Sequence, residues 1–157
     1  MVNKLFNVIG PCTAIFGRKD YQQLRTIEKM VEDLDMPVEV VGMPTFREPD
    51  GLAMSSRNIY LGKAERERAL ALVSGLRAAH RLYAQGQRSV GTLRRAASDP
   101  VAGAADAVDY VTAADPDTLR ALPDESLTPG RLLIAIAARI GRTRLIDNTV
   151  LGEDKLI

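Results

Sequence analysis

The feature of the chain that most constrains its fold is a strand, helix and strand pattern between residues 12 and 43. The run CTAIF, Cys12 to Phe16, is short and apolar and stops at Gly17, which predicts a buried strand. Between residues 19 and 34, apolar side chains recur at spacings of three and four, at Leu24, Ile27, Val31 and Leu34. This period predicts a helix with one buried side. VEVVGM, residues 38–43, predicts a second strand, so the three segments indicate a βαβ unit with a right-handed crossover.

The rest of the chain has the pattern of an α+β module. A long helix with one apolar face is predicted over residues 64–85, and a shorter one over residues 89–97. The Ala- and Gly-rich residues 98–106 predict a connecting loop. Strands are predicted from Ala107, over RLLIAIAARI and over GRTRLIDNTVL, the last two as a pair. The fold class is therefore α/β plus α+β, with one domain over residues 1–45 and another over residues 46–157.

Composition excludes several classes of partner. Of 157 residues, 46% are hydrophobic and 26% charged, and 21 basic against 20 acidic side chains give a net charge of +1. Such a chain has no overall field for nucleic acid or an anionic membrane. Its longest apolar runs fall short of the ~20 residues of a membrane span, and its first residues lack a signal-peptide layout. The single cysteine, Cys12, excludes an internal disulfide, is expected to be a small core residue, and suits a reducing cytoplasm.

The loop FGRKD follows the first predicted strand, where parallel α/β sheets bind their ligands. Gly17 frees the backbone to turn, and Arg18 and Lys19 stand at the start of the predicted helix, which is a place suited to phosphate. The alternative is that Asp20 stabilises the first helical turn while both cations are merely solvated.

The loop DGLAMSSRN follows the second predicted strand and offers more specific groups. Ser55 and Ser56 can each donate and accept a hydrogen bond, and the planar guanidinium of Arg57 can clamp two phosphate oxygens. The alternative is a serine that caps a helix and an arginine in a surface salt bridge. Two such loops at neighbouring strand ends favour a nucleotide site, and we expect the second loop to be mobile without its ligand.

His80 invites a functional interpretation, but its setting predicts a structural role. It lies on the apolar side of the long predicted helix, with no Cys, Asp or His at metal-ligand spacing. It is the single histidine of the chain and lies far from any positioned nucleophile, so no catalytic triad can be assembled. The sequence shows no metal cluster.

Three stretches of the chain resemble the pantothenate synthetases, which are pantoate–β-alanine ligases. They are KLFNVIGPCTAIFGRKDYQQL, VVGMPTFREPDGLAMSSRNIYL and GRTRLIDN, in the family's order and spacing. The resemblance implies a partial Rossmann-like nucleotidyltransferase sheet followed by a small α+β carboxyl-terminal domain. The stretch MSSR stands where the related class I aminoacyl-tRNA synthetases keep their mobile Lys-Met-Ser-Lys-Ser-type loop.

The resemblance also implies a reaction in the pathway to coenzyme A. The carboxylate of pantoate attacks the α-phosphorus of ATP, pyrophosphate leaves, and the amine of β-alanine displaces AMP from pantoyl adenylate to give pantothenate. Mg²⁺ is expected with the ATP, and a homodimer is expected as the assembly.

Site residues are carried over by position. The ATP loop is matched by Gly17, Arg18, Lys19 and Asp20, and a pantoate-binding glutamine by Gln23. The phosphate-side loop is matched by Met54, Ser55, Ser56 and Arg57, and a nucleotide contact, mainly through backbone atoms, by Phe46. Catalysis is expected from Lys19, Ser55, Ser56 and Arg57, which would neutralise the charge that develops as pyrophosphate leaves.

The departure from the family is large. The family's paired histidines, of His-Ile-Gly-His type, and a second pantoate glutamine have no counterpart here, so the chain resembles a carboxyl-terminal portion. Two functions stay open: an enzyme fragment with half an ATP site and weak or no activity alone, or a binding or assembly module that keeps the fold without the chemistry. An incomplete parallel sheet would expose a strand edge, and we expect self-association through residues 1–45.

Overall fold

The chain divides into two compact units, Met1–Phe46 and Arg47–Ile157. The computed structural model describes residues 1–128 and 130–156, so the final residue of the second predicted domain lies outside the described residues. None of the helices in the described ranges is long and apolar enough to cross a membrane.

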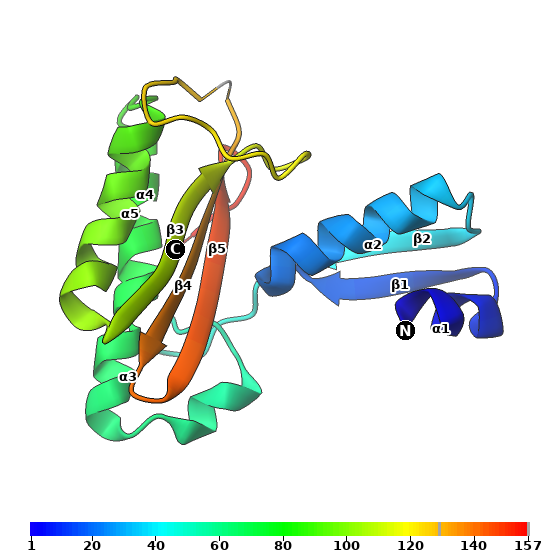
Figure 1. Cartoon of the computed structure of the whole chain (residues 1–157), viewed down its shortest axis with the longest axis horizontal. Helices are drawn as coiled ribbons and strands as arrows, with labels where there is room; N and C mark the ends of the chain where they lie inside the picture. Colours follow the sequence, from blue (N-terminus) through cyan, green and yellow to red (C-terminus); the bar gives the residue numbers. More distant parts are fainter. Residues whose placement is uncertain (129, 157) are drawn as a thin grey trace. The chain divides into compact units, whose positions relative to one another are not determined.

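The first unit contains the βαβ pattern expected from the sequence. It begins with a helix α1 (Val2–Ile9), followed by β1 (Cys12–Gly17), a 3₁₀ turn η1 (Arg18–Asp20), α2 (Tyr21–Asp33) and β2 (Val38–Met43), as Figure 1 shows. The two strands are parallel and pair in register from Cys12 opposite Val38 to Gly17 opposite Met43. The predicted parallel unit is therefore present.

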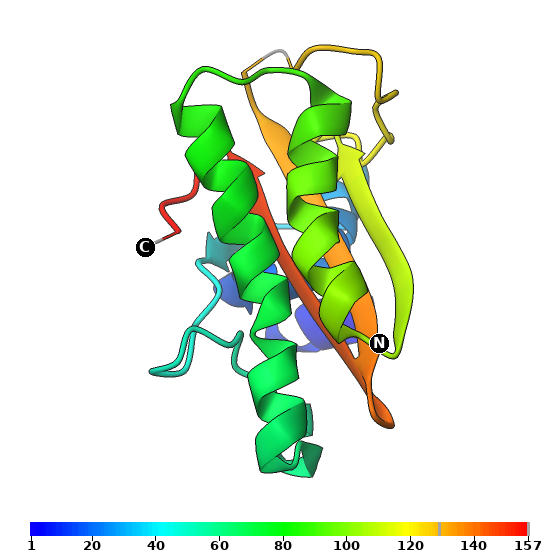
Figure 2. The same cartoon turned by 90° about the vertical axis from the view of Figure 1, so that its left-hand side faces the viewer.

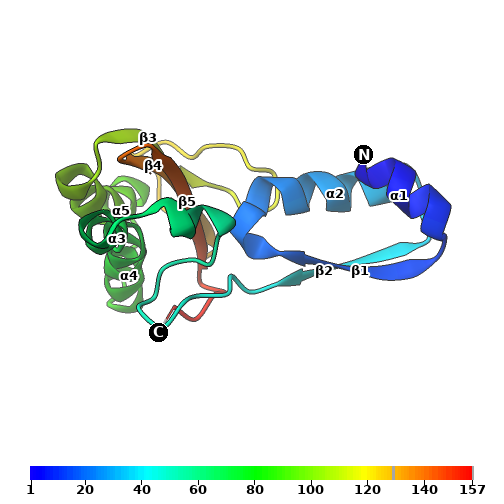
Figure 3. The same cartoon turned by 90° about the horizontal axis from the view of Figure 1, so that it is seen from below.

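Both helices of the first unit lie on one side of its two-stranded sheet (Figure 3). Phe6 from α1 and Ile27 from α2 are buried there with Val38, and the half-buried free thiol of Cys12 packs on them. The alternation of half-buried and exposed residues along β1 follows from this one-sided cover. Helix α1 is not predicted from the sequence, because a segment of eight residues has only about two turns of periodicity.

The second unit is a three-stranded antiparallel sheet with two long helices on one face. Its order is η2 (Ser56–Tyr60), α3 (Lys63–Ala69), α4 (Ala71–Ala84), α5 (Val90–Ala104), β3 (Ala107–Ala114), β4 (Leu132–Ile140) and β5 (Thr143–Leu151). The strands pair in the order β3, β4, β5, and Figure 2 shows α4 and α5 side by side across them. Alternate residues of β4 from Leu132 to Ile140 enter the main core, so the predicted strand pair is confirmed.

Two predicted boundaries in the helices were wrong. The long helix of residues 64–85 is divided at Leu70, whose backbone (φ −63°, ψ −14°) makes one tight turn without any Gly or Pro to signal it. The predicted loop of residues 98–106 is helical as far as Ala104, although Pro100 cannot donate a backbone hydrogen bond. Val101, fully buried beyond that proline, shows why: packing of the helix tail outweighs the lost bond.

Helices α4 and α5 approach closely at Gly75. A Cβ placed on this glycine would lie 2.2 Å from the carbonyl oxygen of Ala97 on α5, a distance that backbone atoms cannot tolerate. Glycine at this position is therefore required by packing rather than by backbone conformation.

Replacing Gly75 by alanine is expected to destabilise the second unit by about 1–3 kcal/mol, because the two helices must move apart to admit the methyl group. Gly103→Ala is the matched control, since no atom lies within 4 Å of its Cβ position on α5. Alanine there should be neutral or stabilising by up to about 1 kcal/mol through helix propensity. Urea unfolding measures both, and equal midpoints for the two variants would contradict the close-packing argument.

Candidate functional site

The first candidate loop lies at the carboxyl end of β1. Gly17 has an ordinary extended backbone (φ −77°, ψ 134°), and no atom lies within 4 Å of the position of a Cβ. The expectation that glycine is needed for the turn was therefore wrong, since any residue adopts this backbone. What glycine provides is open space beside the main chain, where a ligand can approach closely.

The two cations of this loop lie in η1, one turn before α2, rather than in the helix itself. The guanidinium of Arg18 lies 5.7 Å from the ring centre of Tyr21. The ammonium of Lys19 lies 3.9 Å from a carboxylate oxygen of Asp20, and its side chain is only 16% exposed. Asp20 is the residue before α2, but its side chain makes no capping hydrogen bond, so the alternative of a helix cap is not seen.

Gln23 and Phe46 complete the predicted site residues of the first unit. Gln23 is exposed on the first turn of α2 and borders a hollow of about 460 Å³ between the beginning of α1 and the side of α2. The lining is Met1, Val2, Asn3, Gln22, Gln23, Thr26, Ile27 and Met30. Phe46 is 72% exposed. A ligand carboxylate or hydroxyl could reach the amide of Gln23 without moving any core residue.

The second candidate loop lies in the second unit and has a fixed base and an open tip. The Oγ atom of Ser55 accepts a hydrogen bond from the backbone N–H of Arg57 at 3.2 Å, which caps η2. The capping alternative is thus confirmed for Ser55, whose own O–H remains available as a donor. Met54, Ser56 and Arg57 are exposed, and within the described chain no salt bridge holds the Arg57 guanidinium.

A buried ion pair fixes the start of this loop. Both oxygens of Asp147 on β5 accept from the guanidinium of Arg47, at 2.7 and 3.0 Å, across 100 residues of sequence. The Arg47 guanidinium also donates to the carbonyl of Gly51 at 3.1 Å, and the Asn148 N–H donates to Asp147 at 2.8 Å. The side chains of Asp147 and Arg47 are 1% and 17% exposed. The bidentate geometry prevents the first turn of the loop from sliding along the strand.

A second group of contacts fixes the middle of the loop. Buried Asn58 donates to Glu48 at 2.5 Å and to the carbonyl of Ala53 at 3.1 Å. Arg66, in the last turn of α3, donates to Glu48 at 2.5 Å and to Asp50 at 2.8 Å. The hydrogen bond from Asn58, followed by that from Arg66, lowers the pKa of Glu48, and the bond from Arg66 chiefly lowers the pKa of Asp50. Both carboxylates are therefore held in their charged form.

His80 belongs to the same unit but not to the loop. Its Nε2 atom lies 2.7 Å from Oγ1 of Thr149, and that hydroxyl donates to Asp154 at 3.3 Å. Burial lowers the pKa of His80; Asp154 opposes this, and Arg47 adds to it by a smaller amount. These are the contacts of a structural histidine, as the sequence predicted.

The structure brings the predicted residues together in two groups, Gly17 to Gln23 in the first unit and Met54 to Arg57 in the second. Sequence reasoning missed the contacts that hold the second group. The available signal was an acidic residue, Asp147, inside an apolar strand, because a buried carboxylate requires a partner. Among the described residues, no three His, Cys, Asp or Glu side chains are placed to hold a metal ion.

Comparison with known proteins gives consistent matches. The family model described as pantoate-beta-alanine ligase matches residues 1–150. A pantothenate synthetase of Geobacter sulfurreducens is 51% identical over 99% of this chain and 54% of its own length. The solved pantothenate synthetase of Thermus thermophilus superposes with a TM-score of 0.85 at 42% identity, over 94% of this chain and 52% of that one. The ligase of Francisella tularensis, whose structure is described as complexed with beta-gamma ATP and beta-alanine, gives 0.64 at 26% identity, over 99% and 49%.

A parallel βαβ unit followed by this α+β module defines a nucleotidyltransferase-like fold. Within that class, the chain belongs to the pantoate–β-alanine ligase family. It spans about half the length of the relatives it matches. The share of the relatives' length that is matched does not say which half of those proteins this chain corresponds to. The carboxyl-terminal position expected from the sequence therefore stays a prediction.

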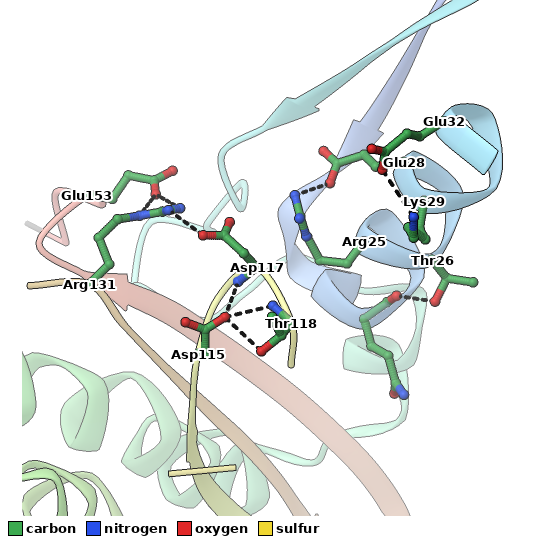
Figure 4. Close-up of polar contacts among 11 residues, drawn as sticks. Arg25, Thr26, Glu28, Lys29, Glu32, Asp115, Asp117, Thr118, Arg131 and Glu153 are labelled. Atoms are coloured by element: carbon green, nitrogen blue, oxygen red, sulfur yellow. Dashed lines mark hydrogen bonds and ion pairs between the residues drawn. The ribbon is translucent and has the colours of Figure 1, made fainter. Parts of the chain in front are cut away.

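Removing the carboxylate of Asp147 is expected to destabilise the second unit strongly. Asp147→Ala leaves the Arg47 guanidinium largely buried without its partner, which costs about 3–5 kcal/mol. Asp117→Ala is the control: its pair with Arg131, drawn in Figure 4, joins side chains that are 54% and 44% exposed, and its loss should cost less than about 1 kcal/mol. Thermal and urea unfolding measure the loss of stability in each variant. A similar small loss in both variants would contradict an anchoring role for Asp147.

Acid is expected to release the middle of the loop. Because the folded state lowers the pKa of Glu48 and Asp50, their stabilisation is present above the ordinary values of 4.5 and 3.8 and is lost as pH falls through the folded values. The side-chain amide of Asn58 should therefore shift in NMR spectra with a midpoint below 4.5. The exposed amide of Asn7, which bonds only Asn3, should stay unchanged. A midpoint at or above 4.5 would contradict the assignment.

Proposed function

We propose that the chain carries the phosphate-binding part of an ATP-dependent, AMP-forming pantoate–β-alanine ligase. The observation that carries the proposal is the second loop, with a base fixed by ion pairs and a tip that presents Ser56 and Arg57 to solvent. Family membership supports the reaction, and the Francisella tularensis structure, described with ATP and beta-alanine, supports the ligands.

In the first step, an oxygen of the pantoate carboxylate bonds to the α-phosphorus while the bond to pyrophosphate breaks. Negative charge then accumulates on the leaving phosphates. The ammonium of Lys19, the hydroxyls of Ser55 and Ser56, and the guanidinium of Arg57 are the groups of this chain suited to neutralise it. The open main chain at Gly17, with Arg18 and Asp20 beside it, suits the nucleotide, and Gln23 suits pantoate.

In the second step, the amine of β-alanine bonds to the acyl carbon, AMP departs with the bonding electrons, and the proton that the amine loses passes to water or to the phosphate of the departing AMP. None of the proposed site residues is a histidine, and Asp20 is the one carboxylate among them. Mg²⁺ is proposed to enter with ATP as part of the substrate, because it is commonly bound through phosphates and only one or two carboxylates. Asp20 is the carboxylate of this chain nearest to Lys19 in the loop.

The setting proposed for this reaction is the cytoplasm, which suits the free thiol of Cys12. The assembled enzyme is proposed to be a homodimer, as the resemblance implies. The competing function is a binding or assembly module without turnover. That function is favoured by the absence of the family's paired histidines, since the sequence contains only His80.

Binding of an ATP analogue is expected to depend on Lys19 and Arg57. Replacing either residue with alanine should remove about 1.5–3 kcal/mol, or about 10- to 150-fold in affinity, through loss of charge-assisted hydrogen bonds. Isothermal titration calorimetry of the whole chain measures the effect.

Matched controls exist for both cations. Lys29→Ala removes a lysine of α2 that pairs with Glu32 (Figure 4) and with Asp33. Arg142→Ala removes an exposed arginine of the β4–β5 turn. Affinity in both controls should stay within about twofold of the original, a difference of about 0.4 kcal/mol. Unchanged binding in both Lys19→Ala and Arg57→Ala would end the phosphate assignment.

Turnover separates the two candidate functions. Pantothenate formation from pantoate, β-alanine and MgATP should be weak or undetectable with this chain alone and should rise when the remaining half of a relative is supplied. Nucleotide binding without turnover under both conditions would favour the binding module.

A further inference from the structure

Helix α3 is held in the second unit by residues other than Arg66. Ala69, its last residue, is fully buried in the main core. The guanidinium of Arg68 donates to the carbonyl of Ala104, the last residue of α5, at 2.8 Å and pairs with Asp106 at 2.6 Å. The helix therefore has contacts with the core and with the end of α5 that do not involve Arg66.

The side chain of Arg66 contacts the second loop instead. Its Nε atom donates to Asp50 at 2.8 Å, and its Nη2 atom donates to Glu48 at 2.5 Å. In the described part of the chain, its guanidinium has no further partner. A planar guanidinium presents its donors at fixed angles, which the ammonium of a lysine does not. Arg66 therefore holds the two carboxylates in one relative orientation.

Glu48 connects Arg66 to η2. One of its carboxylate oxygens, Oε2, accepts from Arg66, and the other, Oε1, accepts from Nδ2 of Asn58 at 2.5 Å. The side-chain amide of Asn58 also donates to the carbonyl of Ala53 at 3.1 Å, so both of its hydrogens are used, and the residue is only 7% exposed. A continuous chain of hydrogen bonds therefore runs from α3 to η2.

Asn58 lies inside η2 and directly follows Arg57. Its backbone N–H donates to the carbonyl of Ser55 at 3.0 Å, and the N–H of Arg57 donates to the Oγ atom of Ser55 at 3.2 Å. The exposed residues Ser56 and Arg57 thus lie between two residues that are held by hydrogen bonds. The direction in which their side chains leave η2 depends on where Asn58 is held.

We propose that Arg66 is a positioning residue for the phosphate-binding tip: through Glu48 and Asn58, it sets the direction in which η2 presents Arg57 to the phosphates. The inference rests on the proposed function, in which Arg57 neutralises charge on the leaving phosphates. The side chains of Arg66, Glu48 and Asp50 are 33%, 26% and 31% exposed, and ion pairs between partly exposed groups add little stability. The contribution of Arg66 is therefore expected in nucleotide affinity more than in the free energy of unfolding.

The test compares two conservative changes on α3, Arg66→Lys and Arg68→Lys. Both keep the charge and lose the planar fork, and the two arginine side chains are similarly exposed, at 33% and 39%. Calorimetric titration with β,γ-methylene-ATP measures affinity. Arg66→Lys should weaken binding by about fivefold or more, whereas Arg68→Lys should stay within about twofold of the original. Equal affinity losses in the two variants would overturn the proposal.

A double-mutant cycle determines whether Arg66 acts through Arg57. In an Arg57→Ala background, adding Arg66→Lys should change the affinity by less than about twofold, because the side chain that Arg66 orients is gone. A loss that persists undiminished in this background would overturn the positioning role. Unchanged affinity in Arg57→Ala alone is a different result: it would overturn the phosphate assignment itself, and the inference with it.

The free protein gives a readout that needs no nucleotide. The side-chain amide signal of Asn58 and the backbone amide signal of Arg57 should shift in NMR spectra of Arg66→Lys and stay unchanged in Arg68→Lys. Circular dichroism establishes that each variant is folded. Should Arg66→Lys unfold the second unit, Glu48→Gln makes the same test with the same expected loss of affinity, because a carboxamide has one oxygen and cannot accept from both partners. Unshifted signals in folded Arg66→Lys would overturn the positioning role, whatever the result with ATP.

Discussion

The buried pair of Arg47 and Asp147 is the interaction on which the second unit depends most. It joins the first residue of that unit to β5, 100 residues later, and both carboxylate oxygens are used. Neither charged group is stable there alone, because a buried charge without a partner loses its hydration and gains no compensating interaction. The start of the loop is therefore fixed to β5 by this ion pair, ahead of the polar residues of the candidate site.

The loop illustrates how rigidity and exposure can alternate over very few residues. Asn58 is buried and bonded to both Glu48 and the carbonyl of Ala53, whereas Arg57, its neighbour, is exposed. A fixed base reduces the conformational entropy that ligand binding must remove, and an exposed tip avoids competition from internal partners. This division explains how a capped 3₁₀ turn at Ser55 is compatible with a phosphate site: the cap uses an acceptor lone pair and leaves the hydroxyl proton available.

Sequence patterns anticipated the regular parts of the fold because those parts follow local periodicity. β2 spans the expected residues, and β4 and β5 pair as expected, since each carries a continuous apolar pattern. The division at Leu70 and the helix beyond Pro100 depend on packing, which no window of sequence contains. The candidate site shows the same limit. Lys19 and Arg57 could be predicted as site residues because they follow strands, whereas the role of Arg47 depends on Asp147, 100 residues away.

The two units differ in how they obtain stability, and this difference bears on function. The second unit buries an extensive core under α4 and α5, whereas the first holds its two parallel strands together with one ladder and one covered face. The loop from Gly17 to Asp20 belongs to the unit with the smaller buried core. A nucleotide bound at this loop would stabilise the first unit by mass action, because it binds the folded unit and not the unfolded one.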